Sequence, residues 1–107
     1  MKGIFLKALK GREKKILRGF AHGLRPVVFI GRQGLSANVV DDIDRALQDH
    51  ELIKIKFIDF KDEKEVLLSE IEEKTDCRCA GTVGNVAVLY REPVDPEKRK
   101  INILNGK

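Results

Sequence analysis

Residues 27–36 read VVFIGRQGLS, and this stretch predicts a strand, a tight loop and the start of a helix. The first four residues are apolar and mostly β-branched, which favours an interior strand covered on both faces. Two glycines then mark a turn, and the hydroxyl of Ser36 can cap a helix that reaches about Gln48. This arrangement is typical of proteins in which strands and helices alternate.

Helix and strand patterns continue on both sides of this unit. An apolar stripe predicts a first helix, which begins either near Leu9 or only after Gly11. Asp62 followed by Glu65 suggests a capping box, and Gly84-Asn85 is a two-residue hairpin signal. The expected helices span about 9–22, 36–48 and 62–74, and the expected strands span about 27–30, 53–57, 77–83 and 86–91.

The order helix–strand–helix–strand–helix–strand–strand predicts a single α/β (α+β) domain with a four-stranded mixed sheet and three helices. The first two strands should be parallel and joined by a right-handed crossover, whereas the closing hairpin should pair antiparallel. We expect the domain to span residues 1–92. Residues 93–107 contain two prolines and several charges, and we expect them to form a loosely attached tail.

Composition excludes several classes of protein. No apolar run in the 107 residues approaches the ~18–20 residues of a membrane span, and residues 4–6 are too short for the apolar core of a secretory signal. Two cysteines and two histidines exclude a disulfide scaffold and a zinc finger, so Cys77 and Cys79 are expected to be buried thiols. We therefore expect a cytoplasmic protein that uses no metal or cofactor and binds neither membranes nor a small-molecule substrate.

The net charge of +4 conceals an uneven distribution. Residues 1–32 contain nine basic residues and one acidic residue, a net charge of +8, whereas the remainder contains twelve basic and sixteen acidic residues, a net charge of −4. A chain with this asymmetry should present an electropositive region that attracts polyanions. The alternative is that the basic residues only solvate a helix face.

The loop Gly31-Arg32-Gln33-Gly34 is the strongest candidate site. Its glycines would allow close approach of a sugar–phosphate chain, and the following helix start favours an anion. Arg32 can add a charge-assisted phosphate contact, and Gln33 can add a neutral hydrogen bond. Loops with this glycine spacing clamp the nucleic-acid backbone in KH domains, although a plain strand-to-helix turn is the alternative. The spacing matches neither a P-loop nor a dinucleotide fingerprint.

Several blocks of sequence also stand in a recognisable order. They are LR at 17–18, AH at 21–22, LRPVV at 24–28, IGRQGL at 30–35, IDRAL at 43–47, HELIK at 50–54 and VLYR at 88–91. Together they resemble the CRM domain, named for chloroplast RNA splicing and ribosome maturation, over about residues 9–91. As a free-standing copy, the chain is similar to the bacterial YhbY-like proteins.

The resemblance implies an RNA-binding domain similar in fold to the C-terminal domain of bacterial translation initiation factor three. It also implies association with ribosomal RNA in precursors of the large ribosomal subunit. The family loop usually has Lys where this chain has Arg32, so the charge is kept but the planar guanidinium changes the contact geometry. No exposed apolar seam demands a dimer, so we expect a monomer.

We therefore predict a non-enzymatic RNA-binding protein. The expected RNA-binding residues are Gly31, Arg32, Gln33, Gly34, Lys14, Arg18, Arg25, Lys54 and Lys56. Lys54 and Lys56 share one face of a strand and could instead be merely solvated. Phe29 and Tyr90 are expected to pack in the core rather than to stack on bases. The alternatives are a nonspecific polyanion- or DNA-binding protein and an RNA-acting enzyme, for which the sequence offers no nucleophile–base pair.

Overall fold

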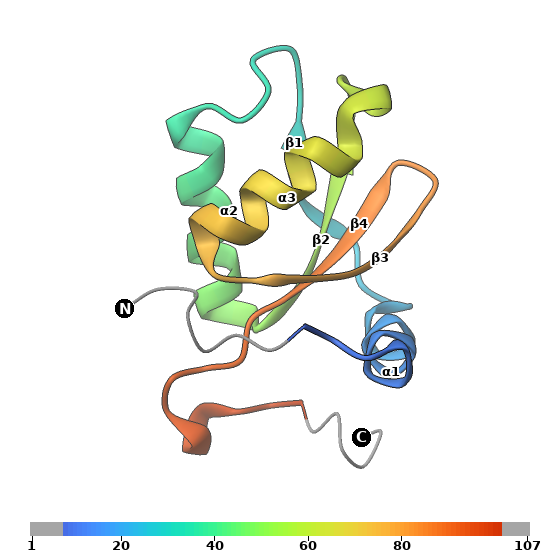
Figure 1. Cartoon of the computed structure of the whole chain (residues 1–107). Helices are drawn as coiled ribbons and strands as arrows, with labels where there is room; N and C mark the ends of the chain where they lie inside the picture. The colour runs from blue at the N-terminus through green and yellow to red at the C-terminus, as the bar shows by residue number, and fades with distance from the viewer. Residues whose placement is uncertain (1–7, 102–107) are drawn as a thin grey trace.

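A computed structural model of the chain describes residues 8–101, so the expectations for residues 1–7 and 102–107 lie outside the described range. Helices and strands alternate in the expected order (Figure 1). They are α1 Gly11–Ala21, β1 Pro26–Ile30, α2 Ala37–His50, β2 Leu52–Phe57, α3 Lys64–Thr75, β3 Arg78–Val83 and β4 Val86–Tyr90, with 3₁₀ turns η1 Lys61–Glu63 and η2 Pro96–Lys98. The predicted α+β class is confirmed.

The four strands form one mixed sheet in the order β1-β2-β4-β3. Strands β1 and β2 are parallel, and β4 lies antiparallel to both of its neighbours, as the crossover and hairpin patterns predicted. The strand register aligns one residue from each strand across the full width of the sheet. This set, which we call the outer row, consists of Phe29, Lys56, Val86 and Val83.

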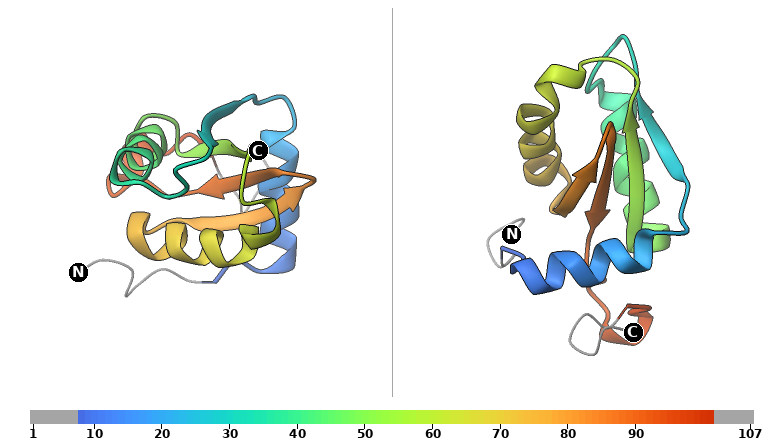
Figure 2. Two further views of the ribbon diagram at one scale, coloured as in Figure 1. Left: turned by 90° about the horizontal axis from the view of Figure 1, so that it is seen from above. Right: turned by 90° about the vertical axis from the view of Figure 1, so that its right-hand side faces the viewer.

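The two sides of the sheet are covered differently. Helices α2 and α3 pack on one side and bury a cluster that includes Ile43, Ile55 and Phe57. Helix α1 crosses one end of the other side (Figure 2), where Leu17 and Val88 belong to a second buried cluster. We call these the α2–α3 side and the α1 side. None of the helices within residues 8–101 has the length and apolar character to cross a membrane.

Strand β1 differs from the prediction. It is an edge strand rather than an interior one, and only Val28 and Ile30 are buried. Val27 is 49% exposed and Phe29 is 52% exposed. Phe29 lies on the α1 side but is left uncovered, because α1 covers the other end of the sheet. The expectation that Phe29 packs in the core is therefore wrong, whereas Tyr90, 4% exposed, is a core residue as expected.

Two helix starts resolve expectations from the sequence. Helix α1 begins at Gly11, the later of the two predicted positions, and the N–H of Lys10 donates to the carboxylate of Glu13 at 2.9 Å. The capping box predicted at Asp62 is wrong. The chain forms the 3₁₀ turn η1 there, and α3 begins at Lys64 without a side-chain cap.

The residues that follow β4 make long-range polar contacts with the rest of the domain. Arg91 donates from Nη1 to Asp44 Oδ1 at 2.6 Å and to the Thr75 carbonyl at 2.8 Å, and from Nη2 to the Asp44 carbonyl at 2.9 Å. The N–H of Lys100 donates to Oε1 of Glu51 at 2.8 Å, and Ile101 packs against the α1 cluster. Residues of the expected tail thus contact the domain, and a domain boundary at residue 92 stays a prediction.

Candidate nucleic-acid interface

The loop between β1 and α2 is a tight turn at one end of the sheet. The N–H of Gly34 donates to the carbonyl of Gly31 at 2.9 Å, and Gly34 has a φ of +62°. A methyl group at Gly34 would lie 3.4 Å from Cε2 of Phe60, so this glycine is already covered by an aromatic ring. A methyl group at Gly31 would meet nothing within 4 Å. Gly34 is therefore required by the turn, whereas Gly31 leaves open space beside the backbone.

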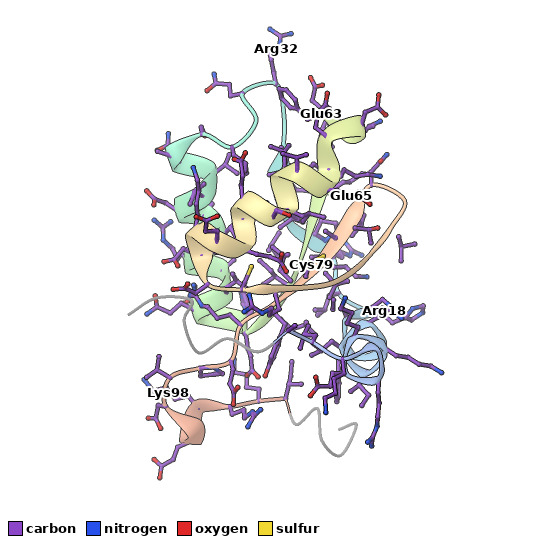
Figure 3. All side chains as sticks on the ribbon, viewed as in Figure 1. Arg18, Arg32, Glu63, Glu65, Cys79 and Lys98 are labelled. Carbon is purple, nitrogen blue, oxygen red and sulfur yellow. The ribbon has the colours of Figure 1, made fainter. Side chains whose placement is uncertain are left out.

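The polar side chains of the loop are presented to solvent. Arg32 and Gln33 are exposed, and Figure 3 shows Arg32 at the tip of the loop, directed away from the molecule. The hydroxyl of Ser36 accepts a hydrogen bond from the N–H of Val39 at 3.2 Å, which confirms the predicted N-cap of α2. The exposed guanidinium thus belongs to a loop that leads into a capped helix N-terminus, and both groups favour an anion.

Lys54 and Lys56 lie on the α1 side of β2, as the alternation predicted. Lys56 is exposed and lies directly across from Phe29 in the register of β1 and β2. Lys54 is half-buried, and its ammonium group donates to the carbonyl of His22, just after α1, at 3.4 Å. Lys56 is the more accessible of the two charges, and Lys54 also helps to attach α1 to the sheet.

The basic residues of α1 cross the opposite end of the same side. Arg18 donates from Nη1 to the carbonyl of Ala80 at 2.8 Å, and its side chain lies over Gly81, with Cδ 3.1 Å from the position a Cβ would occupy there. Arg18 therefore has a structural role that sequence reasoning missed. The signal available in the sequence was a glycine within the expected strand, Gly81, and the structure has a register shift between Cys79 and this residue.

The predicted site residues do not form one compact cluster. The 31–34 loop and α1 lie at opposite ends of the sheet, as the labelled Arg32 and Arg18 show (Figure 3). Lys54 and Lys56 lie between these ends, and Arg25 is exposed in the link from α1 to β1. The structure thus distributes the predicted basic residues over four places: the 31–34 loop at the end of the sheet, strand β2, the link from α1 to β1, and α1 itself.

Charge divides the molecule between its two sides. Helix α1 has four basic residues and one acidic residue, whereas α2 has four acidic and one basic, and α3 has four acidic and two basic. The strand residues directed to the α1 side include no Asp or Glu within the described chain. The α1 side is therefore the electropositive side that the sequence predicted.

The cysteine thiols are unsuited to nucleophilic chemistry. Burial raises the pKa of Cys77 from 9.0 to about 11, although a hydrogen bond from the hydroxyl of Thr75 opposes the shift. Cys77 is fully buried as expected, and Cys79 is only half-buried. Burial also raises the pKa of Cys79, and its hydrogen bond with the Gly81 backbone opposes the shift. Residues 8–101 contain no group of three or more His, Cys, Asp or Glu arranged to hold a metal ion.

Comparisons with known proteins extend this description. Residues 9–91 match the CRS1/YhbY (CRM) domain. A "Probable RNA-binding protein" of Pseudomonas aeruginosa is 34% identical over 97 residues, which are 90% of this chain and 93% of that protein. An RNA-binding protein of Haemophilus influenzae is 37% identical over 87 residues, 80% of this chain and 88% of that protein. The solution structure of a hypothetical RNA-binding protein from Staphylococcus aureus matches with a TM-score of 0.74 and 30% identity, covering 88% of this chain and 99% of that one.

Proposed function

Because the chain belongs to the CRS1/YhbY (CRM) domain family, we propose that it is a non-enzymatic protein that binds RNA along the α1 side of its sheet. The observation that carries this proposal is the basic side, which ends at an open loop with an exposed Arg32. The bacterial relatives named as RNA-binding proteins support the choice of RNA as the polyanion.

The geometry suggests how the RNA is held. Open space beside Gly31 admits a sugar–phosphate chain, and Arg32 offers its guanidinium fork to a phosphate while Gln33 adds a hydrogen bond. From the loop, Lys56 and then Arg25 continue the positive charge toward α1, where Lys14 and Arg18 lie. Phosphate contacts of this kind position a nucleic acid without reading its sequence.

We propose further that the RNA is ribosomal RNA in precursors of the large ribosomal subunit, bound in the cytoplasm by a monomer. Support comes from the family resemblance in the blocks at residues 17–54 and 88–91. A sucrose gradient of lysate with tagged protein tests this part. Comigration with large-subunit or pre-subunit particles that is lost in Arg32→Glu is expected, whereas a tag at the top of the gradient at both low and moderate salt would contradict it.

A pair of charge reversals tests the loop. Arg32→Glu should weaken RNA binding roughly 10-fold or more, because a charge-assisted contact is lost and a repulsive one is introduced. Arg45→Glu makes the same charge change at a residue whose side chain is 72% exposed on α2, and it should have little effect. Fluorescence anisotropy of a labelled RNA at fixed salt measures both affinities, and thermal unfolding should show that both variants remain folded.

The separation of charge also favours a second candidate, a nonspecific polyanion- or DNA-binding protein for which the loop is incidental. In that case Arg32→Glu would weaken binding by little more than Arg45→Glu does. Duplex DNA and structured RNA would then also bind with equal affinity at physiological salt.

A further inference from the structure

Two apolar side chains of the outer row, Phe29 and Val83, are exposed to solvent. Phe29 is the most exposed of the five aromatic side chains within residues 8–101, since Phe57 and Tyr90 are buried and the other two are half-buried. At the other end of the row, Val83 is 72% exposed. An exposed apolar row of this kind on a sheet is a candidate binding surface.

The exposure follows from where α1 lies. The next row of the sheet contains Lys54, Val88 and Gly81. Val88 is buried beneath α1, and the side chain of Arg18 covers Gly81. Helix α1 and the side chain of Arg18 thus cover the row of Val88 and Gly81 but not the outer row. The outer row lies between that covered row and the 31–34 loop.

We propose that the outer row is a stacking platform for an unpaired RNA base, with the base on the ring of Phe29 and an adjoining phosphate on the ammonium group of Lys56. The inference rests on the proposed function and assigns its single-stranded subsite. Phe29 is two residues from Gly31 in an extended strand, so a backbone held at the loop passes beside the ring. Aromatic rings on positively charged sheet surfaces bind single strands by stacking on successive bases.

Charge complementarity favours RNA over a protein partner on this surface. Lys56 stands beside the ring in the row, Lys54 lies in the next row, and Arg32 lies beyond it in the loop. The strand residues on this side within the described chain include no carboxylate, and Asp59, whose N–H donates to the carbonyl of Ile30 at 3.0 Å, lies beyond the end of β2. The bases of a duplex are already stacked on one another, so the platform suits an unpaired base.

A tryptophan at position 29 would report on stacking directly. The chain contains no Trp, so the emission of Phe29→Trp comes from this position alone. Single-stranded RNA should quench that emission. Val66→Trp is the matched control, because Val66 is 64% exposed on α3, on the acidic side, and its emission should not change. Anisotropy of the labelled RNA follows binding in the same samples.

A second measurement separates stacking from electrostatics. Phe29→Ala should weaken binding of a single-stranded RNA by about 5- to 150-fold, the range found for the loss of one stacked base, and leave binding of a duplex RNA of equal charge unchanged. Phe29→Leu keeps apolar area without a π-face and should behave like Phe29→Ala.

The outcomes distinguish this inference from the function on which it rests. If the wild-type protein binds no RNA, both fail. If RNA binds in an Arg32-dependent way but the emission of the Phe29→Trp variant is unchanged, the platform is wrong and the proposed function stands. Equal losses for single-stranded and duplex RNA, or no loss for either, would also overturn the platform, and the latter would leave the row available to a protein partner.

Discussion

The two glycines of the loop have different physical reasons to be glycine. Gly34 adopts a left-handed φ beneath the ring of Phe60, whereas Gly31 has ordinary backbone geometry and open space beside it. A turn needs the first property, and a ligand that approaches the backbone needs the second. Substitution can therefore separate folding from binding within a single four-residue loop.

We predict that Gly34→Ala lowers the free energy of unfolding by about 1–2 kcal/mol, the cost of a left-handed φ for a residue with a Cβ. Gly31→Ala should leave that free energy nearly unchanged and weaken RNA binding, because its methyl group enters the space proposed for the sugar–phosphate chain. Urea unfolding and anisotropy measure the two effects. Wild-type affinity in Gly31→Ala would show that the RNA backbone does not approach this residue.

Burial of Cys77 predicts a loss of stability at alkaline pH. Its folded pKa of about 11 exceeds the 9.0 of an exposed thiol, so below pH 9 the thiol is protonated in both states. Between pH 9 and 11 only the unfolded chain releases the proton, and the free energy of unfolding should fall by about 1.4 kcal/mol per pH unit. Urea unfolding at pH 8 and 10.5 should show a smaller fall for Cys77→Ala than for the wild type. Equal falls would contradict this prediction.

At the scale of residues, the sequence correctly predicted the features that depend only on a few neighbouring residues. The Ser36 cap, the Gly84-Asn85 hairpin and the exposed Arg32 follow from patterns a few residues long. The exposure of Phe29 could not be predicted in this way. An apolar run looks the same in an edge strand and in a central one, and the exposed fraction depends on where α1 crosses the sheet.

At the scale of elements, Phe60 shows why one helix start was mispredicted. Its backbone is left-handed, with a φ of 56°, and its ring packs on Gly34, far from it in sequence. The residues that follow therefore form the turn η1, and α3 starts at Lys64. The Asp62–Glu65 pattern is a local signal, and it could not show that a distant loop fixes the entry into the helix.

Arg91 joins three elements, and its loss should be costly. Its guanidinium, 20% exposed, bonds Asp44 of α2 and the carbonyl of Thr75 at the end of α3, just after β4. Arg91→Met should lower the free energy of unfolding by about 2–3 kcal/mol, because charge-assisted bonds are lost and their acceptors are left without a donor.

The matched control for Arg91 is Arg45→Met, which removes an exposed pair with Asp42 at 3.9 Å. It should change the free energy of unfolding by less than about 0.5 kcal/mol. Urea unfolding of the two variants side by side measures the difference. A similar effect in both would mean that Arg91 is no more than a surface charge.

At the scale of the whole molecule, the basic α1 side predicts a strong salt dependence. Each phosphate contact to a single-stranded RNA should add about 0.7 to the slope of log affinity against log salt concentration. Arg32→Glu should reduce the magnitude of the wild-type slope by about that amount. Anisotropy titrations at several salt concentrations provide both slopes, and a flat wild-type response would argue against phosphate recognition.

The opposite charges of the two sides have a further consequence for how the protein would assemble with RNA. A protein that is basic all round can bridge two strands and condense them into aggregates. Here the acidic helices α2 and α3 would face outward from a bound RNA and repel a second strand. The bound protein would therefore cover one segment of RNA and repel neighbouring segments, which would keep those segments from aggregating while they form their own base pairs.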